Sequence, residues 1–412
     1  MLCHLKTHCK ALIKSIFKLT RNFLSNLFAP PLPPPQKTLL ILRTDAIGDF
    51  ILFSPFIEQI RAYFSDYHIS LIANIANKDL ALGLHSKHID SFIFISHKKF
   101  NRNLFYRIRF LSMLKRQRFT IVLNPLYSRS LLCKELISRI NAQISFTPSG
   151  DSINMPLEFK NSDNAYYTKL TPCRDEVLFE YYRNSEFMRC VFESLRFLSD
   201  KKADFLPKAR LDSALLPKME SFIDITKIDS NGFCVLFIGA SASYRKWDIN
   251  NFAKVALHLI EKYQQTIIIC GGKEDIANGK RLLDLVRQDY TLTNKIIDFS
   301  GKTSLMQLAT LVYNGNLVVS NETSAAHLAA LLDTAIIAVS NGNHLGRFIP
   351  YPKRISDKYY PVFHPFITAN PDKYKELSNK FAYKSELNIN EIEASEVITI
   401  IDKIFKEKKC KK

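Results

Sequence analysis

From Lys37 onward, short apolar segments alternate with segments in which apolar residues recur at helical spacing. The apolar segments predict β-strands at residues 39–42, 68–75, 92–96 and 119–125. The helical spacing predicts α-helices at about 55–64, 103–117 and 130–140. Strands that alternate with helices indicate βαβ units and a parallel sheet.

This alternation breaks between about residues 149 and 208. Residues 150–176 are polar and predict a loop, whereas residues 176–198 have helical spacing and a high content of Phe, Tyr and Arg. Such an aromatic helix is typical of a cover packed on the core or between domains. The alternative is a helix that lines an acceptor pocket, with Arg183 and Arg189 as phosphate contacts.

The strand–helix pattern restarts at Gly232 and runs to about residue 343. Its units are residues 232–263, 266–275, 296–312, 317–332 and the strand 335–343. Asp248 precedes the first of these helices and is a plausible N-cap. The sequence therefore predicts an α/β protein with two Rossmann-like, doubly wound parallel-sheet domains. A dinucleotide-binding fold is not supported, because no GxGxxG motif follows the first strand.

A chain of 412 residues exceeds the size of most single cores, so we expect two folded domains. We predict an arm and proline-rich linker at 1–36, an N-terminal domain at 37–215 and a C-terminal domain at 216–412. The pattern leaves open whether the last helix packs back on the N-terminal domain.

The net charge of +18 indicates an anionic partner. Phosphorylated small molecules, an acidic membrane and nucleic acid all satisfy it, as does a basic surface without a specific partner. No helix-turn-helix, RRM or zinc signature accompanies the charge, so nucleic acid is not expected. The eight cysteines form no CxxC pair, and several lie in apolar strands. They predict a reducing compartment and no metal site.

The first 28 residues combine basic and apolar side chains and contain no acidic residue. This pattern is typical of a helix on an anionic membrane surface, or of a helix packed on the protein itself. No apolar run reaches the roughly 20 residues of a membrane-spanning helix. The segment APPLPPPQ (29–36) then predicts a semi-rigid spacer.

Two polar segments that follow strands are candidates for ligand chemistry. The first is a short turn that holds Gly48 and Asp49, before an amphipathic helix, in the position where open α/β sheets bind ligands. The second is residues 320–327, where small residues precede a helix whose N-terminus suits a phosphate. A simple capping role is the alternative for Glu322 and its neighbours, and His327 is equally consistent with a buried core histidine.

Four segments together resemble glycosyltransferase family 9, the heptosyltransferases of lipopolysaccharide core synthesis. They are RTDAIGDFILFSPFIEQIR, GASASYRKW, DFSGKTSLMQLATLV and SNETSAAHLAAL, in this order along the chain. The resemblance covers about residues 37–145 and 230–350. It implies a GT-B fold, in which the two domains face each other across a cleft. It also implies an inverting, metal-independent transfer of a sugar from a nucleotide-sugar such as ADP-heptose, which is a substrate and not a cofactor.

The same resemblance assigns roles to individual residues. Asp49 matches the family's catalytic base, and Lys246 matches a lysine that contacts the donor phosphates and assists catalysis. Thr44 and Gly48 shape the acceptor side beside Asp49. The remaining donor-side residues are Gly239, Ser241, Ser243, Glu322, Thr323, Ser324, Ala325, Ala326 and His327. No metal ligand is implied.

The resemblance has two departures and leaves an alternative function open. Glu322 and Ser324 replace the aspartate and glycine of the family's Asp-Thr-Gly-x-x-His donor motif. Residues 149–208 and 342–366 do not match the family, although His344, Arg347 and Tyr351 are able to return to the cleft. We expect a transferase that acts on a lipopolysaccharide or lipid-linked acceptor. It would be cytoplasmic and peripheral on the inner face of the membrane, bound through residues 1–28. The alternative is a non-catalytic protein that binds a nucleotide-sugar or polyanion.

Overall fold

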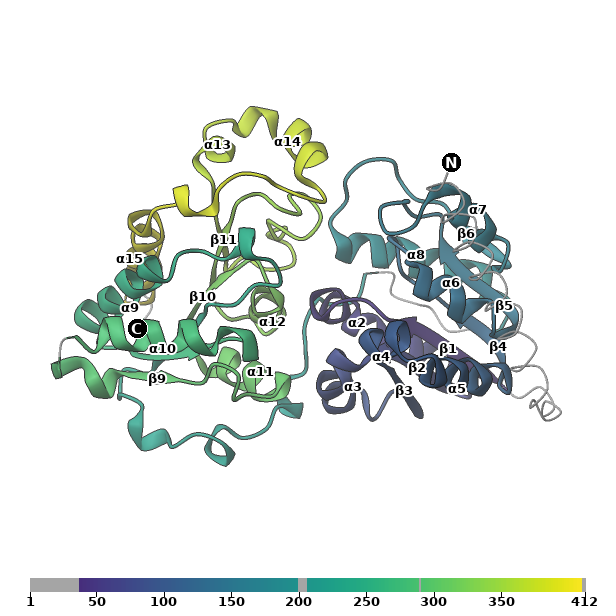
Figure 1. Ribbon diagram of the computed structural model, residues 1–412, viewed down its shortest axis with the longest axis horizontal. Helices are drawn as coiled ribbons and strands as arrows, with labels where there is room; N and C mark the ends of the chain where they lie inside the picture. The colour runs from purple at the N-terminus through teal and green to yellow at the C-terminus, as the bar shows by residue number, and fades with distance from the viewer. Residues whose placement is uncertain (1–36, 199–205, 289, 410–412) are drawn as a thin grey trace, which may run out of the picture.

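The computed structural model describes residues 37–198, 206–288 and 290–409, which form two α/β lobes (Figure 1). The predicted amphipathic arm and proline-rich spacer at residues 1–36 lie outside the described residues. None of the described helices combines the length and apolarity that crossing a bilayer requires.

The N-terminal lobe contains a six-stranded parallel sheet in the order β3-β2-β1-β4-β5-β6. Its strands are β1 (Thr38–Arg43), β2 (His68–Asn74), β3 (Ser91–Ile95), β4 (Arg118–Leu123), β5 (Asn141–Pro148) and β6 (Lys169–Thr171). Its helices are α2 (Ile47–Tyr63), α3 (Lys78–His85), α4 (His97–Arg102), α5 (Leu104–Lys115), α6 (Leu131–Ile137), α7 (Leu157–Asn164) and α8 (Glu180–Ser194).

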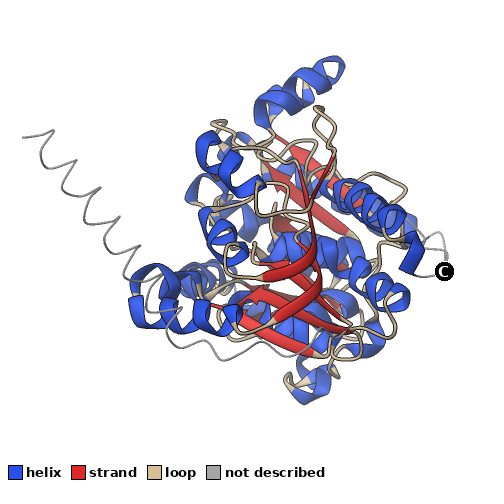
Figure 2. Cartoon of the chain, turned by 90° about the vertical axis from the view of Figure 1, so that its right-hand side faces the viewer, coloured by secondary structure: helices blue, strands red, loops and turns tan. Residues whose placement is uncertain are grey.

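The C-terminal lobe repeats this architecture with the strand order β12-β11-β10-β7-β8-β9, again all parallel. Its strands are β7 (Phe233–Phe237), β8 (Thr266–Cys270), β9 (Ile296–Asp298), β10 (Leu317–Asn321), β11 (Ile336–Ser340) and β12 (Tyr359–Phe363). Its helices are α9 (Ile249–Tyr263), α10 (Ile276–Val286), α11 (Leu305–Asn314), α12 (Ser324–Leu331), α13 (Pro365–Thr368), α14 (Tyr374–Phe381) and α15 (Ala394–Lys409). Figure 2 shows the strands of the two sheets with helices packed around them. The predicted α/β fold with two doubly wound sheets is confirmed.

Three predictions about the elements were wrong. Gly48 and Asp49 lie in the first turn of α2, not in a loop before it. Residues 150–176 contain α7 and β6 instead of a continuous loop. The sequence pattern also missed three strands, β5, β6 and β12, so each sheet has six strands instead of the four and five that were predicted. Strand β5 buries polar residues, β6 has only three residues, and β12 contains Pro361 at a sheet edge.

Helix α2 is buried on nearly every side and is therefore not amphipathic as predicted. It packs on the N-terminal sheet, on α8 and, across the lobe boundary, on α12 (Figure 1). The neighbouring helices α3 and α11 also meet across this boundary, where the amide of Met306 donates to Asp79 Oδ2 at 2.7 Å. One hydrophobic core thus runs through both lobes between these helices.

The C-terminal helix α15 packs on α9 within its own lobe, which answers the question that the sequence left open. Asp402 of α15 accepts hydrogen bonds from Lys262 Nζ at 2.8 Å and from Tyr263 Oη at 2.8 Å. Apolar residues of α15 join the core beneath α9 and α10. Asp248 caps α9 as predicted, because its side chain accepts from the Asn250 amide.

Candidate active site

A cleft of about 850 Å³ lies between the lobes at the carboxyl ends of both sheets. In each sheet the strand order reverses at a central pair, β1 and β4 in one and β7 and β10 in the other. The loops after these four strands line the cleft. Such switch points are where open α/β sheets bind ligands.

The structure brings most of the predicted site residues to this cleft. Those that line it are Thr44, Gly48, Asp49, Gly239, Ser241, Glu322, Thr323, Ser324 and His327. Four others do not line it: Ser243, Lys246, Ala325 and Ala326. The two alanines are fully buried in α12, where their small size lets the helix pack closely.

Asp49 presents its carboxylate to the cleft from the first turn of α2. Within the described residues, no hydrogen bond engages this carboxylate. Burial raises the pKa of Asp49 above its usual value, and Glu180 adds to the rise, whereas Arg43 opposes it. Arg43 is itself fixed, because its Nη2 donates to the Asp49 backbone carbonyl at 2.7 Å. Asp49 is thus an available carboxylate with an increased affinity for protons.

Asp45 is a second carboxylate at the same edge of the cleft, but it is engaged differently. Its Oδ2 lies 3.0 Å from Arg43 Nη2. Burial raises the pKa of Asp45 to about 8, against the attraction of Arg43. Asp45 therefore carries a proton in much of the population at neutral pH.

Gly48 brings α2 into direct contact with His327 of α12. A β-carbon added at Gly48 would lie 2.7 Å from His327 Cδ2, closer than such atoms approach. His327 is buried, and its Nδ1 lies 2.7 Å from the hydroxyl of Tyr351. Burial lowers the pKa of His327 to about 4, so the ring is neutral at physiological pH. The lack of a side chain at Gly48 therefore allows α2 and α12 to pack in direct contact at the base of the cleft.

Glu322 is held by two partners on the C-terminal side. Its Oε1 lies 3.0 Å from His344 Nδ1 and 3.2 Å from Arg245 Nη2, and Oε2 is buried without a hydrogen-bond partner in the described chain. Burial opposes ionisation, but His344 and Arg245 nevertheless hold the pKa of Glu322 below its usual value. His344 adopts a left-handed backbone conformation (φ 60°) in the loop that carries its ring to Glu322.

Lys246 does not line the cleft itself but pairs with Asp275, which does. Its Nζ donates to Asp275 Oδ1 at 2.6 Å, while Asp275 Oδ2 accepts from the Gly272 amide at 2.9 Å. Asp275 also lies so close to Gly239 that a β-carbon there would approach its Oδ2 to 2.3 Å. Lys246 and Asp275 thus fix the two glycine-containing loops. Of the two adjacent cations, Arg245 lines the cleft and Lys246 does not.

Polar contacts between two residue pairs tie the lobes together across the cleft. Arg347 Nη2 lies 3.3 Å from Glu180 Oε2, and the Glu180 amide donates to the Arg347 carbonyl at 2.8 Å. The Tyr383 hydroxyl donates to Asp151 Oδ2 at 2.8 Å. Glu180 belongs to α8, so the aromatic helix packs on the core, as predicted for a cover helix, and also contributes Glu180 to the cleft. Arg183 and Arg189, the predicted phosphate contacts, do not line the cleft. Arg347 does return to the cleft, as the sequence allowed.

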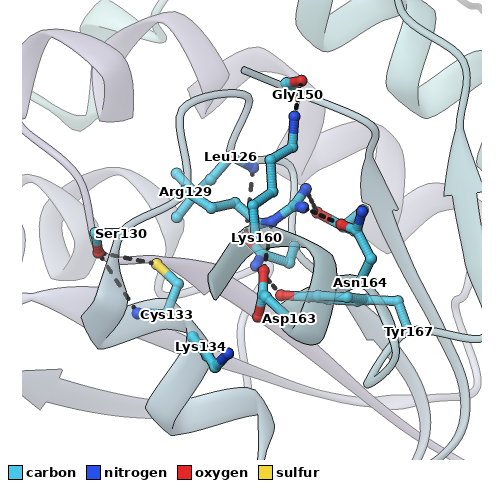
Figure 3. A network of polar contacts seen from close by, with 12 residues as sticks. Leu126, Arg129, Ser130, Cys133, Lys134, Gly150, Lys160, Asp163, Asn164 and Tyr167 are labelled. Carbon is cyan, nitrogen blue, oxygen red and sulfur yellow. Dashed lines mark hydrogen bonds and ion pairs between the residues drawn. The ribbon is translucent and has the colours of Figure 1, made fainter. Parts of the chain in front are cut away.

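A buried network holds loops on the N-terminal side of the cleft (Figure 3). Arg129 Nε donates to Asp163 Oδ2 at 2.7 Å, and its Nη1 donates to Thr147 Oγ1 at 3.1 Å. Arg129 thereby joins the loop after β4 to β5 and α7. No sequence motif marked Arg129, because its partners are 18 to 35 positions away.

Comparisons with known proteins agree with this geometry. The sequence profile of glycosyltransferase family 9 (heptosyltransferase) matches residues 189–357. This region contains three of the four motifs and is similar to family 9. The match confirms the resemblance to glycosyltransferase family 9 that the motifs predicted.

The individual relatives have low sequence identity to this chain, but each match spans almost the whole length of the relative. The lipopolysaccharide heptosyltransferase 1 of Campylobacter coli is 20% identical over 375 residues, which are 89% of this chain and 98% of the relative. A family 9 glycosyltransferase structure from Veillonella parvula has a TM-score of 0.65 at 16% identity and covers 92% of this chain and 100% of its own. The Escherichia coli ADP-heptose lipopolysaccharide heptosyltransferase II has a TM-score of 0.64 at 14% identity, with 90% and 99% covered. These structures support the predicted GT-B fold.

Several residues of the cleft were not assigned from the sequence. They include Asp45, Glu180, Tyr127 and Arg245. Arg245 lies within the motif GASASYRKW, directly before Lys246, and differs from Lys246 because its side chain lines the cleft. Glu180 lay in the segment without family resemblance, so no motif marked it.

Proposed function

We propose that this protein is a family 9 glycosyltransferase that moves a heptose from ADP-heptose to a lipopolysaccharide or other lipid-linked glycan acceptor, with inversion and without a metal ion. The observation that carries the proposal is the position of the Asp49 carboxylate. It lies in the same cleft as the N-terminus of α12 and Arg245. The named activities of the Campylobacter coli and Escherichia coli relatives support the choice of donor and acceptor.

The C-terminal side of the cleft suits a sugar diphosphate. The first turn of α12 has backbone amides without intrahelical acceptors, and its dipole favours an anion. Arg245 supplies a permanent positive charge beside this turn. Together these groups offset the charge that grows on the departing diphosphate, which is the task that a metal ion performs in other transferases. We therefore transfer the phosphate role predicted for Lys246 to Arg245.

The N-terminal side suits the acceptor. An Asp49 carboxylate in reach of the acceptor hydroxyl takes its proton while the oxygen attacks the anomeric carbon. The C–O bond to the diphosphate breaks as the new glycosidic bond forms, so a single displacement inverts the configuration. The raised pKa of Asp49 makes the carboxylate a stronger base than an exposed aspartate.

The location follows from the proposed acceptor. A lipid-linked acceptor places the enzyme on the inner face of the cytoplasmic membrane as a peripheral protein. The basic arm at residues 1–28 is the anchor predicted from the sequence.

A transfer assay with ADP-heptose and a membrane lipid extract tests the proposal. Wild-type protein should release ADP only when both substrates are present, and Asp49→Asn should bind ADP-heptose in a thermal-shift experiment without releasing ADP. Donor binding by the wild type without any turnover would favour the non-catalytic alternative.

A further inference from the structure

The segment between Asp90 and Glu135 contains no acidic residue. Its 44 residues carry ten Lys and Arg. They form β3, α4, α5, β4 and the start of α6, and the helices among them cover one face of the N-terminal sheet (Figure 1). Much of the +18 net charge is therefore concentrated in one continuous part of the fold.

Exposed apolar side chains mark the first turns of the helices on this face. Leu104 and Phe105 open α5, and Leu131 opens α6. Phe105 is 75% exposed, which is unusual for a side chain of this size. Three exposed cations, Lys98, Lys99 and Arg102, lie on the adjoining α4. We call these six residues the basic apolar rim.

The residues of the rim lie on neighbouring elements at one edge of the sheet. Helices α4, α5 and α6 each begin at the carboxyl end of the N-terminal sheet, and Arg107 of α5 pairs with Glu135 of α6 at 2.8 Å. Within the described residues, Lys98, Lys99 and Arg102 have no ion-pair partner. The rim therefore offers both charge and apolar surface to a partner.

The rim also adjoins the cleft. His97, the first residue of α4, and Ser130, the N-cap of α6, both line the cleft. A partner seated on the rim would thus lie at the acceptor side of the cleft mouth.

We propose that the basic apolar rim is a docking surface for an anionic lipid bilayer. Cations attract the phosphate groups of anionic lipids, while Leu and Phe side chains at helix starts enter the boundary between headgroups and acyl chains. Nucleic acid would satisfy the cations but would leave Leu104 and Leu131 without an apolar partner. This surface is distinct from the arm at residues 1–36, and the proposal does not depend on the transfer reaction.

A fluorescence experiment on the full chain tests contact at the rim directly. The chain has a single tryptophan, Trp247, which is buried, so the wild type supplies a constant background. The indole of a Phe105→Trp variant should shift its emission to shorter wavelength with phosphatidylglycerol vesicles, and brominated acyl chains should quench it. Phosphatidylcholine vesicles should produce neither effect.

Phe197→Trp is the matched control. Phe197 is 72% exposed, but it follows α8, whose last turn lies by Tyr63 at the end of α2, on the other face of the sheet. The indole at position 197 should not respond to vesicles. An equal response at both positions, or none at position 105, would overturn the proposal. If the indole at position 105 responded only to protein concentration or only to RNA, the rim would be a self-association or nucleic-acid surface, and the membrane proposal would be wrong.

A charge-removal pair provides an independent measurement. The Lys98→Gln/Lys99→Gln/Arg102→Gln variant should lower partitioning onto phosphatidylglycerol vesicles by roughly tenfold or more. Lys254→Gln/Lys280→Gln/Arg281→Gln removes the same charge from exposed positions of α9 and α10 and should retain partitioning. Both variants keep residues 1–36, so any contribution of the arm is common to them. Equal partitioning of the two variants would contradict the proposal.

Discussion

His327 of α12 lies against Gly48 of α2 so closely that a β-carbon at Gly48 would come within 2.7 Å of the imidazole Cδ2. This contact joins the two lobes at the floor of the cleft, one residue from Asp49. We expect Gly48→Ala to lower the free energy of unfolding by about 1–3 kcal/mol, because the buried ring cannot move aside freely. Chemical denaturation measures the change.

Gly83→Ala is the matched control for this prediction. Gly83 of α3 meets Met306 of α11 across the same lobe boundary, and a β-carbon there would approach the Met306 Sδ to 2.5 Å. A flexible methionine can rearrange, so the Gly83 variant should lose less stability than the Gly48 variant. Combining Gly48→Ala with His327→Ala should recover part of the loss. A double variant that is strictly additive would show that the contact is not the cause.

The two carboxylates beside Arg43 should differ in their contribution to transfer. Asp49→Asn should lower kcat by about 10²- to 10⁴-fold, as expected for loss of a general base, with donor affinity retained. Asp45→Asn should be far less harmful, because burial already keeps Asp45 largely protonated near neutral pH. Steady-state kinetics on both variants decides the assignment, and a larger loss for Asp45→Asn would reverse it.

Asp45 should also make folding stability depend on pH. Its pKa rises from 3.8 in the unfolded chain to about 8 in the fold, so the folded state binds the proton more tightly. Stability should therefore fall as pH increases from about 4 to about 8, by a few kcal/mol at most. Asp45→Asn should reduce this dependence, leaving the smaller part due to Asp49, and should stabilise the protein more at pH 8 than at pH 5. The exposed Asp372→Asn variant is the control, and thermal melts at both pH values provide the comparison.

Arg245 and Lys246 are adjacent but should respond differently to substitution. Arg245→Gln should weaken binding of ADP-heptose by roughly 10- to 100-fold, since it removes a charge-assisted contact in the cleft. Lys246→Gln should instead cost about 1–3 kcal/mol of stability, because Asp275 is buried and loses its partner. Calorimetric titration and thermal melts on each variant separate the two effects. A stronger loss of donor affinity in Lys246→Gln would restore the original role of that lysine.

The strands that the sequence predicted well are those made of continuous apolar residues, such as β1, β8 and β10. A strand buried on both faces requires this composition, so the pattern is direct. The start of α2 was predicted too late, because Ala46 offers no side-chain cap to mark it.

Site residues that lie within one continuous sequence motif could be predicted, whereas contacts between distant segments could not. Asp49, Glu322 and the small residues around them lie in continuous motifs that follow strands. Among the partners that shift their pKa values, Arg43 opens the same motif as Asp49, whereas Glu180 and His344 come from segments without family resemblance. Whether Arg245 or Lys246 faces the cleft depends on a backbone turn, which residue type alone does not encode.

The hydrophobic core that passes from α2 and α3 into α11 and α12 has a consequence for engineering. The two halves of the chain are not interchangeable cassettes, since each covers apolar surface of the other. A chimera that takes its C-terminal half from another protein would need an α12 surface that is complementary to α2. Otherwise, a different side chain at the position of His327 would pack poorly against Gly48. Changing the donor preference therefore calls for substitutions within the cleft instead of an exchange of whole lobes.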